Sequence, residues 1–133
     1  MSQKKLNYPL KNTLNLLDNK FKFEIIFYLT QNKMRFGEIK SSLLHINQQL
    51  LAKLLKQLEK DKLIKKKEFK GFPKKVEYNI TFFGLIFKPL VDNMHKWEEK
   101  NKKTLLKNIN KKNSDSLYDY YSVSYTHLRA HET

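Results

Sequence analysis

The chain has 133 residues, a formal net charge of +14 and a sequence pI near 9.8. With 40% hydrophobic and 13% aromatic residues it can bury a core, which excludes global disorder and suits a single domain. It contains no Cys, which excludes disulfides, thiolate metal sites and thiol nucleophiles. No apolar run approaches the roughly 20 residues of a membrane-spanning helix, and the first residues lack a signal-peptide core, so we expect a cytoplasmic protein without a membrane partner.

The excess of positive charge indicates a polyanionic partner such as nucleic acid. Nearly all of the cations are Lys, and Asn and Ile are also frequent, a composition typical of an AT-rich genome. Codon bias is therefore an alternative origin for part of the charge.

Two helices are predicted at the start of the folded region. Residues 1–7 are polar and are expected to be flexible. A short first helix follows, because Leu10, Leu14 and Leu17 recur at spacings of four and three. The apolar stretch 21–30 could be a strand or a helix, but its length and its internal polar residues favour a helix.

The next segment has the pattern of a helix-turn-helix. Apolar residues at spacings of three and four predict a short helix over residues 35–44. His45-Ile46 then turns the chain into a second helix over residues 47–60. Turns of this kind often contain Gly, and here there is none.

The helix predicted over residues 47–60 has a leucine face and a polar face. Asn47 is a good N-cap residue, and the inward positions are Leu51, Leu55 and Leu58. The outward positions are Gln48, Gln49, Ala52, Lys53 and Lys56. In a DNA major groove Gln can pair with adenine, and Lys can reach guanine or phosphate. The alternative is an ordinary solvated face, since outward Lys and Gln carry little information by themselves.

A β-hairpin is predicted after this helix. Residues 63–70 and 76–80 have strand character and flank a Gly/Pro turn. The lysines at its tip are Lys70, Lys74 and Lys75. They could contact the phosphate backbone of DNA, or they could protect an exposed strand edge from pairing.

A final helix is predicted after Thr81, which can cap it, and Pro89 should kink or interrupt it. Its apolar stripe has a near-heptad spacing and consists of Phe83, Phe87, Leu90, Met94 and Trp97. Such a stripe is commonly plain core. Because the preceding small domain already has a core, we interpret it as a dimer surface.

The C-terminal part changes in composition twice. Residues 101–121 form a Lys/Asn-rich extension whose order is doubtful. Residues 122–133 differ abruptly from the rest and resemble translated sequencing-adapter read-through, so we exclude them as a non-native tail. The natural C-terminus would then be missing. A metal pair of His127 and His131 at helical spacing is the weaker alternative.

Residues 8–100 resemble the HxlR family of bacterial winged-helix transcriptional regulators. The most specific match is Pro73-Lys74-Lys75-Val76-Glu77-Tyr78 with Thr81 and Gly84, which is similar to Pro-x-Arg-Val-Glu-Tyr-x-x-Thr-x-x-Gly. Two further matches lie in the helix-turn-helix. Arg35-Phe36-Gly37-Glu38-Ile39 resembles Arg-Phe-x-Glu-Leu, and residues 51–64 resemble Leu-x-x-x-Leu-x-x-Leu-Glu-x-Asp-Gly-Leu-Val.

The resemblance implies a mainly α-helical winged helix-turn-helix with one small hairpin and with N- and C-terminal dimerisation helices. It implies a homodimer on double-stranded DNA, commonly a repressor, at a near-palindromic operator with half-sites roughly 34 Å apart. We expect Gln48, Gln49 and Lys53 to contact base edges. The expected phosphate contacts are Lys56, Lys74, Lys75, Arg35 and Asn47. The expected dimer interface contains Leu10, Leu14, Phe87, Leu90, Met94 and Trp97.

Three departures from the family pattern affect the expected function. Many members carry a sensing Cys just before the Pro of the first helix, where this chain has Tyr8, so thiol-based sensing is excluded for this sequence. Lys62 replaces the usual Gly after the second helix, which should stiffen or reshape the approach to the wing. Lys75 replaces Arg, which keeps the charge but loses bidentate geometry.

Two functions are alternatives to a DNA-binding regulator. A winged-helix protein-interaction module would show only non-specific affinity for nucleic acid. An enzyme is the weakest hypothesis, because Glu38, His45 and Glu77 are far apart in sequence and no nucleophile or phosphate loop accompanies them. No cofactor is expected. The sequence names no residues for an effector and does not identify the operator or the regulated genes.

Overall fold

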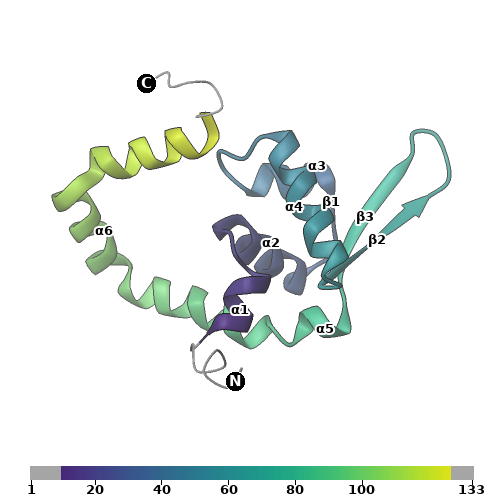
Figure 1. Ribbon diagram of the computed structural model, residues 1–133, viewed down its shortest axis with the longest axis horizontal. Helices are drawn as coiled ribbons and strands as arrows, with labels where there is room; N and C mark the ends of the chain where they lie inside the picture. Colours follow the sequence, from purple (N-terminus) through teal and green to yellow (C-terminus); the bar gives the residue numbers. More distant parts are fainter. Residues whose placement is uncertain (1–9, 127–133) are drawn as a thin grey trace, which may run out of the picture.

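The computed structural model describes residues 10–126, with side chains to residue 109. It is mostly helical with a small three-stranded antiparallel sheet (Figure 1). The elements in order are α1 (Lys11–Leu16), α2 (Lys20–Gln31), β1 (Met34–Arg35), α3 (Phe36–Ser42), α4 (Gln48–Lys60), β2 (Ile64–Phe69), β3 (Lys75–Ile80), α5 (Phe82–Leu85) and α6 (Lys88–Thr126). The mainly α-helical winged helix-turn-helix is therefore confirmed. Within the described residues, none of the helices has the length and apolar character needed to cross a bilayer.

The centre of the molecule is α2, and the segment 21–30 is a helix as predicted. Asn19 caps it, with its side-chain oxygen accepting a hydrogen bond of 2.7 Å from the backbone N–H of Phe21. Ile25, Ile26 and Leu29 are fully or almost fully buried. Aliphatic residues of α4 and of the β2 start complete the same core, among them Leu51, Leu55, Leu58, Leu63 and Ile64.

The sheet contains one strand that the sequence did not reveal. Met34 and Arg35 form β1, which pairs antiparallel with β3, and the strand order is β1-β3-β2. The third helix consequently begins at Phe36, not at Arg35. A strand of two residues is too short to produce a period-two pattern, so it can be recognised only from its pairing with β3 in the structure.

The connection from the hairpin to the last helices depends on Thr81 and Gly84. The Thr81 hydroxyl accepts a hydrogen bond of 2.9 Å from the Gly84 N–H and lies 2.7 Å from the Lys62 carbonyl oxygen, to which it donates. A Cβ on Gly84 would collide with the carbonyl oxygen of Leu63 and with the side chain of Ile80. The short α5 thus packs tightly against the start of β2, and Thr81 caps it as predicted.

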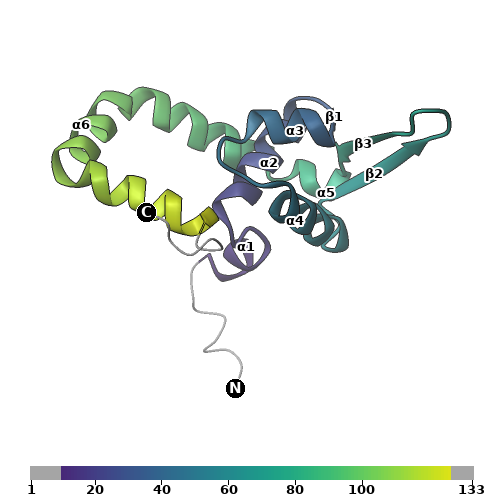
Figure 2. The same ribbon diagram turned by 90° about the horizontal axis from the view of Figure 1, so that it is seen from above.

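The final helix, α6, begins after an interruption at residues 86–87 and runs to Thr126. Pro89 lies in its first turn, where the missing N–H is tolerated, so the predicted interruption is confirmed. The helix also continues through the 101–121 extension whose order was doubtful. It arcs away at the end of the molecule opposite the β2–β3 hairpin (Figures 1 and 2).

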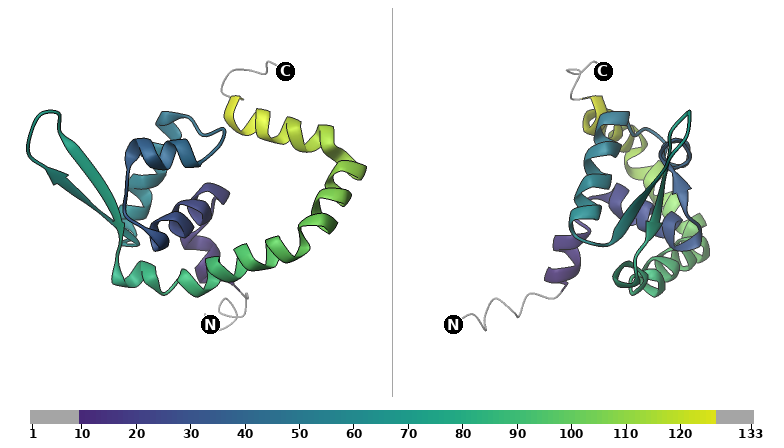
Figure 3. Two further views of the ribbon diagram at one scale, coloured as in Figure 1. Left: turned by 180° about the vertical axis from the view of Figure 1, so that it is seen from behind. Right: turned by 90° about the vertical axis from the view of Figure 1, so that its right-hand side faces the viewer.

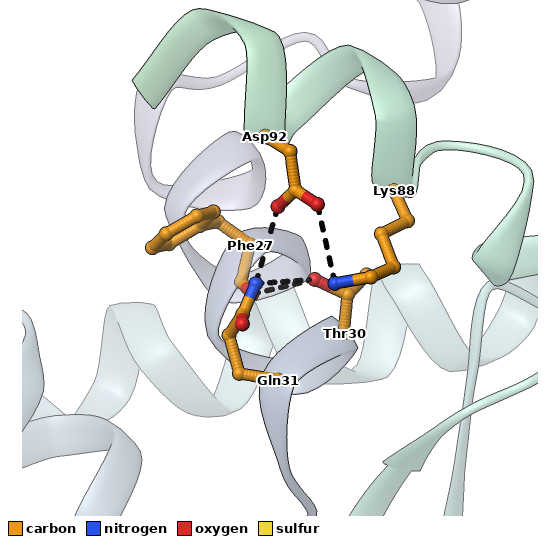
Figure 4. Close-up of polar contacts among 5 residues, drawn as sticks. All are labelled: Phe27, Thr30, Gln31, Lys88 and Asp92. Carbon is orange, nitrogen blue, oxygen red and sulfur yellow. Dashed lines mark hydrogen bonds and ion pairs between the residues drawn. The ribbon is translucent and has the colours of Figure 1, made fainter. Parts of the chain in front are cut away.

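A polar cluster joins α2 to the first turns of α6 (Figure 4). One oxygen of Asp92 accepts a hydrogen bond of 3.2 Å from the Gln31 side-chain amide, and the other lies 3.2 Å from the Lys88 ammonium. The Thr30 hydroxyl donates to the Phe27 carbonyl at 2.7 Å. This cluster fixes the direction in which α6 leaves the winged domain.

Residues 1–7, which were expected to be flexible, lie outside the described residues, as do His127 and His131 and the part of the suspected non-native tail beyond residue 126.

Candidate nucleic-acid interface

The polar face of α4 is exposed along its length. Asn47 caps the helix, its side-chain oxygen accepting a hydrogen bond of 2.7 Å from the Leu50 N–H. The inward residues Leu51, Leu55 and Leu58 are buried as expected, and Leu54 joins them. The outward residues Gln48, Gln49, Lys53 and Lys56 are all exposed. The leucine face therefore fixes α4 on the core while four long polar side chains face outward.

The turn into α4 is tight although it lacks Gly. His45 adopts a left-handed backbone conformation, with φ 67°, and the next residue, Ile46, is buried. This is the conformation in which Gly has the least steric cost, and His tolerates it better than most residues. The sequence therefore keeps the helix-turn-helix geometry with a different residue in the turn.

The hairpin stands beside α4 and projects from the domain (Figure 3). All the lysines of its strands and tip are exposed: Lys65, Lys66, Lys67, Lys70, Lys74 and Lys75. Glu68 partly offsets this charge, with carboxylate oxygens 3.4 Å from the Lys74 ammonium and 3.9 Å from that of Lys66. Exposed pairs of this kind are weak and leave the lysines available to other anions.

Two of the hairpin lysines are oriented by an aromatic ring. The ammonium groups of Lys67 and Lys75 lie 5.0 Å and 5.9 Å from the centre of the Phe69 ring. Since Phe69 pairs with Lys75 and lies two residues from Lys67, the three side chains share one face of the hairpin. That face presents a fixed pair of cations close to the tip.

Arg35 lies at the start of α3, where its backbone N–H donates a hydrogen bond of 2.8 Å to the Glu38 carboxylate. Its side chain is exposed, and in β1 it pairs with Glu77 across the sheet. The sheet therefore links the first helix of the helix-turn-helix to the hairpin. Of the residues expected to contact DNA, Asn47 is half-buried at the start of α4, and the others are exposed on α4, on the hairpin and at the start of α3.

Comparison with known proteins agrees with this geometry. The family model described as HxlR-like helix-turn-helix matches residues 16–105. The chain belongs to the HxlR family. It is 35% identical over 94 residues to the HTH-type transcriptional regulator YdeP of Bacillus subtilis, covering 71% of this chain and 73% of that protein. It is 39% identical over 90 residues to the regulator YdzF of the same species, covering 67% and 83%.

A solved structure of another regulator has the same architecture. The redox regulator HypR in its reduced form superposes with a TM-score of 0.69 and 31% identity, covering 74% of this chain and 98% of that one. The present HxlR chain contains no Cys. Its relatives and structural neighbours are helix-turn-helix transcriptional regulators, not enzymes.

Lys62 stands where the family pattern has Gly, and it adopts the left-handed conformation itself, with φ 65°. Its N–H donates to the Glu59 carbonyl at 3.0 Å, and the N–H of Leu63 donates to the Leu58 carbonyl at 3.0 Å. The end of α4 is thus closed by backbone hydrogen bonds at a residue other than Gly.

Five of the six residues expected at a dimer interface are exposed and one is not. Leu10 and Leu14 are exposed on α1, and Leu90, Met94 and Trp97 are exposed on α6. Phe87 is only 7% exposed and belongs to the monomer core. It precedes α6, and its ring meets that of Phe83 edge-on at 6.0 Å between ring centres. The near-heptad spacing did not reveal this because it treats residues 83–97 as one continuous helix.

The acidic groups near α6 lie away from the lysine-rich hairpin. A hollow of about 270 Å³ between α2 and α6 is lined by aromatic and carboxylate side chains, among them Phe23, Phe27, Glu24 and Glu98. Burial raises the pKa of the Glu24 carboxyl; the charge of Lys20 opposes this shift, and the charge of Glu98 adds a smaller upward contribution. Among the residues that the structure describes, no cluster of His, Asp and Glu could hold a metal ion.

Part of the basic surface lies on β2, where no contact residue was predicted from the sequence. Lys65, Lys66 and Lys67 were assigned to the first strand but were not singled out. Their position on the outer strand β2, at the edge of the sheet, is what exposes them. A run of three lysines in a strand next to a helix-turn-helix was the available signal.

Proposed function

We propose that this HxlR chain is a sequence-specific DNA-binding repressor that acts as a homodimer on a near-palindromic operator. The observation that supports it best is the joint exposure of the Gln/Lys face of α4 and the lysines of the adjacent hairpin. A helix that enters the major groove needs long polar side chains outside and a firm apolar anchor inside, and α4 has both. A bacterial cytoplasmic location follows from the proposed partner.

The proposed contacts divide into two classes. Gln48, Gln49 and Lys53 would contact base edges from α4. The residues that would contact phosphate are Asn47, Lys56, Lys74, Lys75 and Arg35. Base contacts set the discrimination between sequences, whereas phosphate contacts set a salt-dependent affinity that is nearly independent of sequence.

The proposed dimer uses exposed apolar residues of the first and last helices, which are Leu10, Leu14, Leu90, Met94 and Trp97. These residues are 38–68% exposed in the monomer, and an exposed apolar surface of this kind is typical of an interface. A two-fold dimer would place two α4 helices in successive major grooves about 34 Å apart.

Fluorescence anisotropy with the gene's own upstream DNA tests this proposal. The full chain is titrated with the upstream duplex and with a scrambled duplex of equal composition, each at two salt concentrations. Tight binding to the upstream duplex with clear discrimination against the scramble is the expected result. Footprinting of the bound duplex then shows whether the site is near-palindromic.

The alternative, a protein-interaction module, predicts a different pattern. Equal and salt-sensitive binding to both duplexes would mean that the lysines provide only non-specific affinity. Absence of binding to either duplex would contradict the proposed function.

A further inference from the structure

The tip of the hairpin carries a fully exposed aromatic side chain. Phe72 has a relative exposure of 101%, so its ring packs against none of the residues that the structure describes. It follows Gly71, whose φ of 134° is accessible to Gly and not to other residues, and precedes Pro73. The ring is therefore exposed in the turn between β2 and β3.

The other two aromatic residues of the hairpin are covered. Tyr78 is 9% exposed and packs in the core, and the Phe69 ring lies beneath two lysine ammonium groups. Phe72 thus gives no stabilisation to the monomer, and leaving an aromatic ring in water is unfavourable. Its burial requires a partner.

The surroundings of Phe72 indicate the chemistry of that partner. Lys70 and Lys74 lie two residues before and two residues after Phe72, and both are exposed. Lys67 in β2 and Lys75 at the start of β3 are exposed further from the tip. The minor groove of DNA has phosphates on both sides, which the lysines could contact. Between them lie stacked base steps, and proteins that bind this groove insert apolar side chains between such steps.

We propose that Phe72 is an apolar wedge that enters the minor groove beside each half-site and partly unstacks one base step. This inference rests on the proposed function, because α4 must occupy the major groove for the adjacent hairpin to reach the neighbouring minor groove. The flanking lysines hold the phosphates of the two strands while the ring enters between the bases. Side chains that act in this way kink the duplex toward the major groove.

The wedge gives this chain a source of specificity that α4 does not supply. Pyrimidine–purine steps such as TA and CA unstack more easily than other steps. Operators of this protein should therefore have such a step at the position of the wing, outside the bases that α4 contacts.

The test uses the full chain and the footprinted upstream duplex with 2-aminopurine at the flanking step. Binding of the native protein should raise the 2-aminopurine fluorescence, because unstacking relieves its quenching. Phe72→Ala should abolish that rise and weaken binding about tenfold, since stacking on an aromatic ring accounts for a comparable loss elsewhere. The salt dependence of binding should stay unchanged, because no charge is removed.

Two matched variants separate a wedge from general effects. Phe82→Ala removes a ring that is 92% exposed on α5, outside the hairpin, and should leave affinity and fluorescence unchanged. Lys74→Ala should lower the salt dependence and keep the fluorescence rise. Since Phe72 contacts nothing in the monomer, Phe72→Ala should melt at the native temperature.

The outcomes distinguish this inference from the proposed function. Specific binding by the native protein without a fluorescence change, or an unchanged rise in Phe72→Ala, would overturn the wedge alone. Failure of the native protein to discriminate the upstream duplex from its scramble would overturn both.

Discussion

Lys62 and His45 hold left-handed backbone conformations at the two ends of α4, where Gly is the residue with the least steric cost. The sequence shows that Gly is missing from both turns but does not show whether the turns change or the residues bear the strain. In the structure both residues adopt the left-handed conformation, which is unfavourable for residues other than Gly and so lowers the stability of the fold.

Replacing Lys62 with Gly should raise the stability of the protein. Relief of the left-handed conformation is expected to increase the free energy of unfolding by about 1 kcal/mol, reduced somewhat by the greater entropy of unfolded Gly. Thermal denaturation followed by circular dichroism measures the change. Lys62→Ala is the control, since it removes the charge but keeps the strain, and it should show no gain.

Gly84 should be intolerant of any side chain. A Cβ there would overlap the Leu63 carbonyl and the Ile80 side chain, so Gly84→Ala should lower the free energy of unfolding by about 1–3 kcal/mol. Gly37 in α3 provides a matched control because a Cβ there meets nothing within 4 Å. Gly37→Ala should be neutral or slightly stabilising in urea denaturation, and equal losses in both variants would contradict the packing argument.

At the scale of elements, long periodic patterns were predictable and short or interrupted ones were not. The leucine spacing over 47–60 and the alternation over 76–80 identified α4 and β3 because each pattern spans several residues. Two residues carry no period, so β1 was missed. The core position of Phe87 depends on the interruption between α5 and α6, which is a tertiary effect. The exposure of Phe72 likewise follows from the turn geometry, not from the residue type.

The proposed roles of α4 and of the hairpin predict two different binding phenotypes. Gln49→Ala should reduce discrimination between operator and scramble by about 1–3 kcal/mol while leaving the salt dependence unchanged. Lys74→Ala should weaken binding almost equally on both duplexes and lower the slope of log affinity against log salt by about 1. Anisotropy titrations over a salt series measure both effects. Unchanged operator binding in both variants would contradict the docking arrangement.

At the scale of the whole molecule, α6 connects the winged domain to the proposed partner. Asp92 contacts Gln31 of α2, and the exposed residues Leu90, Met94 and Trp97 recur along α6 at spacings of four and three. A helix in a protein gains most of its stability from packing against other elements. Within the monomer α6 packs against α2, and in the proposed dimer it would also pack against the second chain.

Trp97→Glu should convert the dimer to a monomer, because a charge would replace a large ring at the proposed interface. Analytical ultracentrifugation should show half the native mass, and operator affinity should fall at least tenfold because each monomer contacts one half-site. Lys96→Glu is the matched control, since it introduces the same carboxylate one position away from the apolar stripe. A native protein that sediments as a monomer would remove the basis of this prediction.

The pairing of β1 with β3 has a consequence for the order of folding. β2 and β3 are neighbours in sequence and can form a hairpin within microseconds, whereas Met34 can reach Tyr78 only after the whole helix-turn-helix between them has been brought into place. Docking of β1 is therefore expected late on the folding pathway. Destabilising changes in β1 should accelerate unfolding and leave the refolding rate almost untouched.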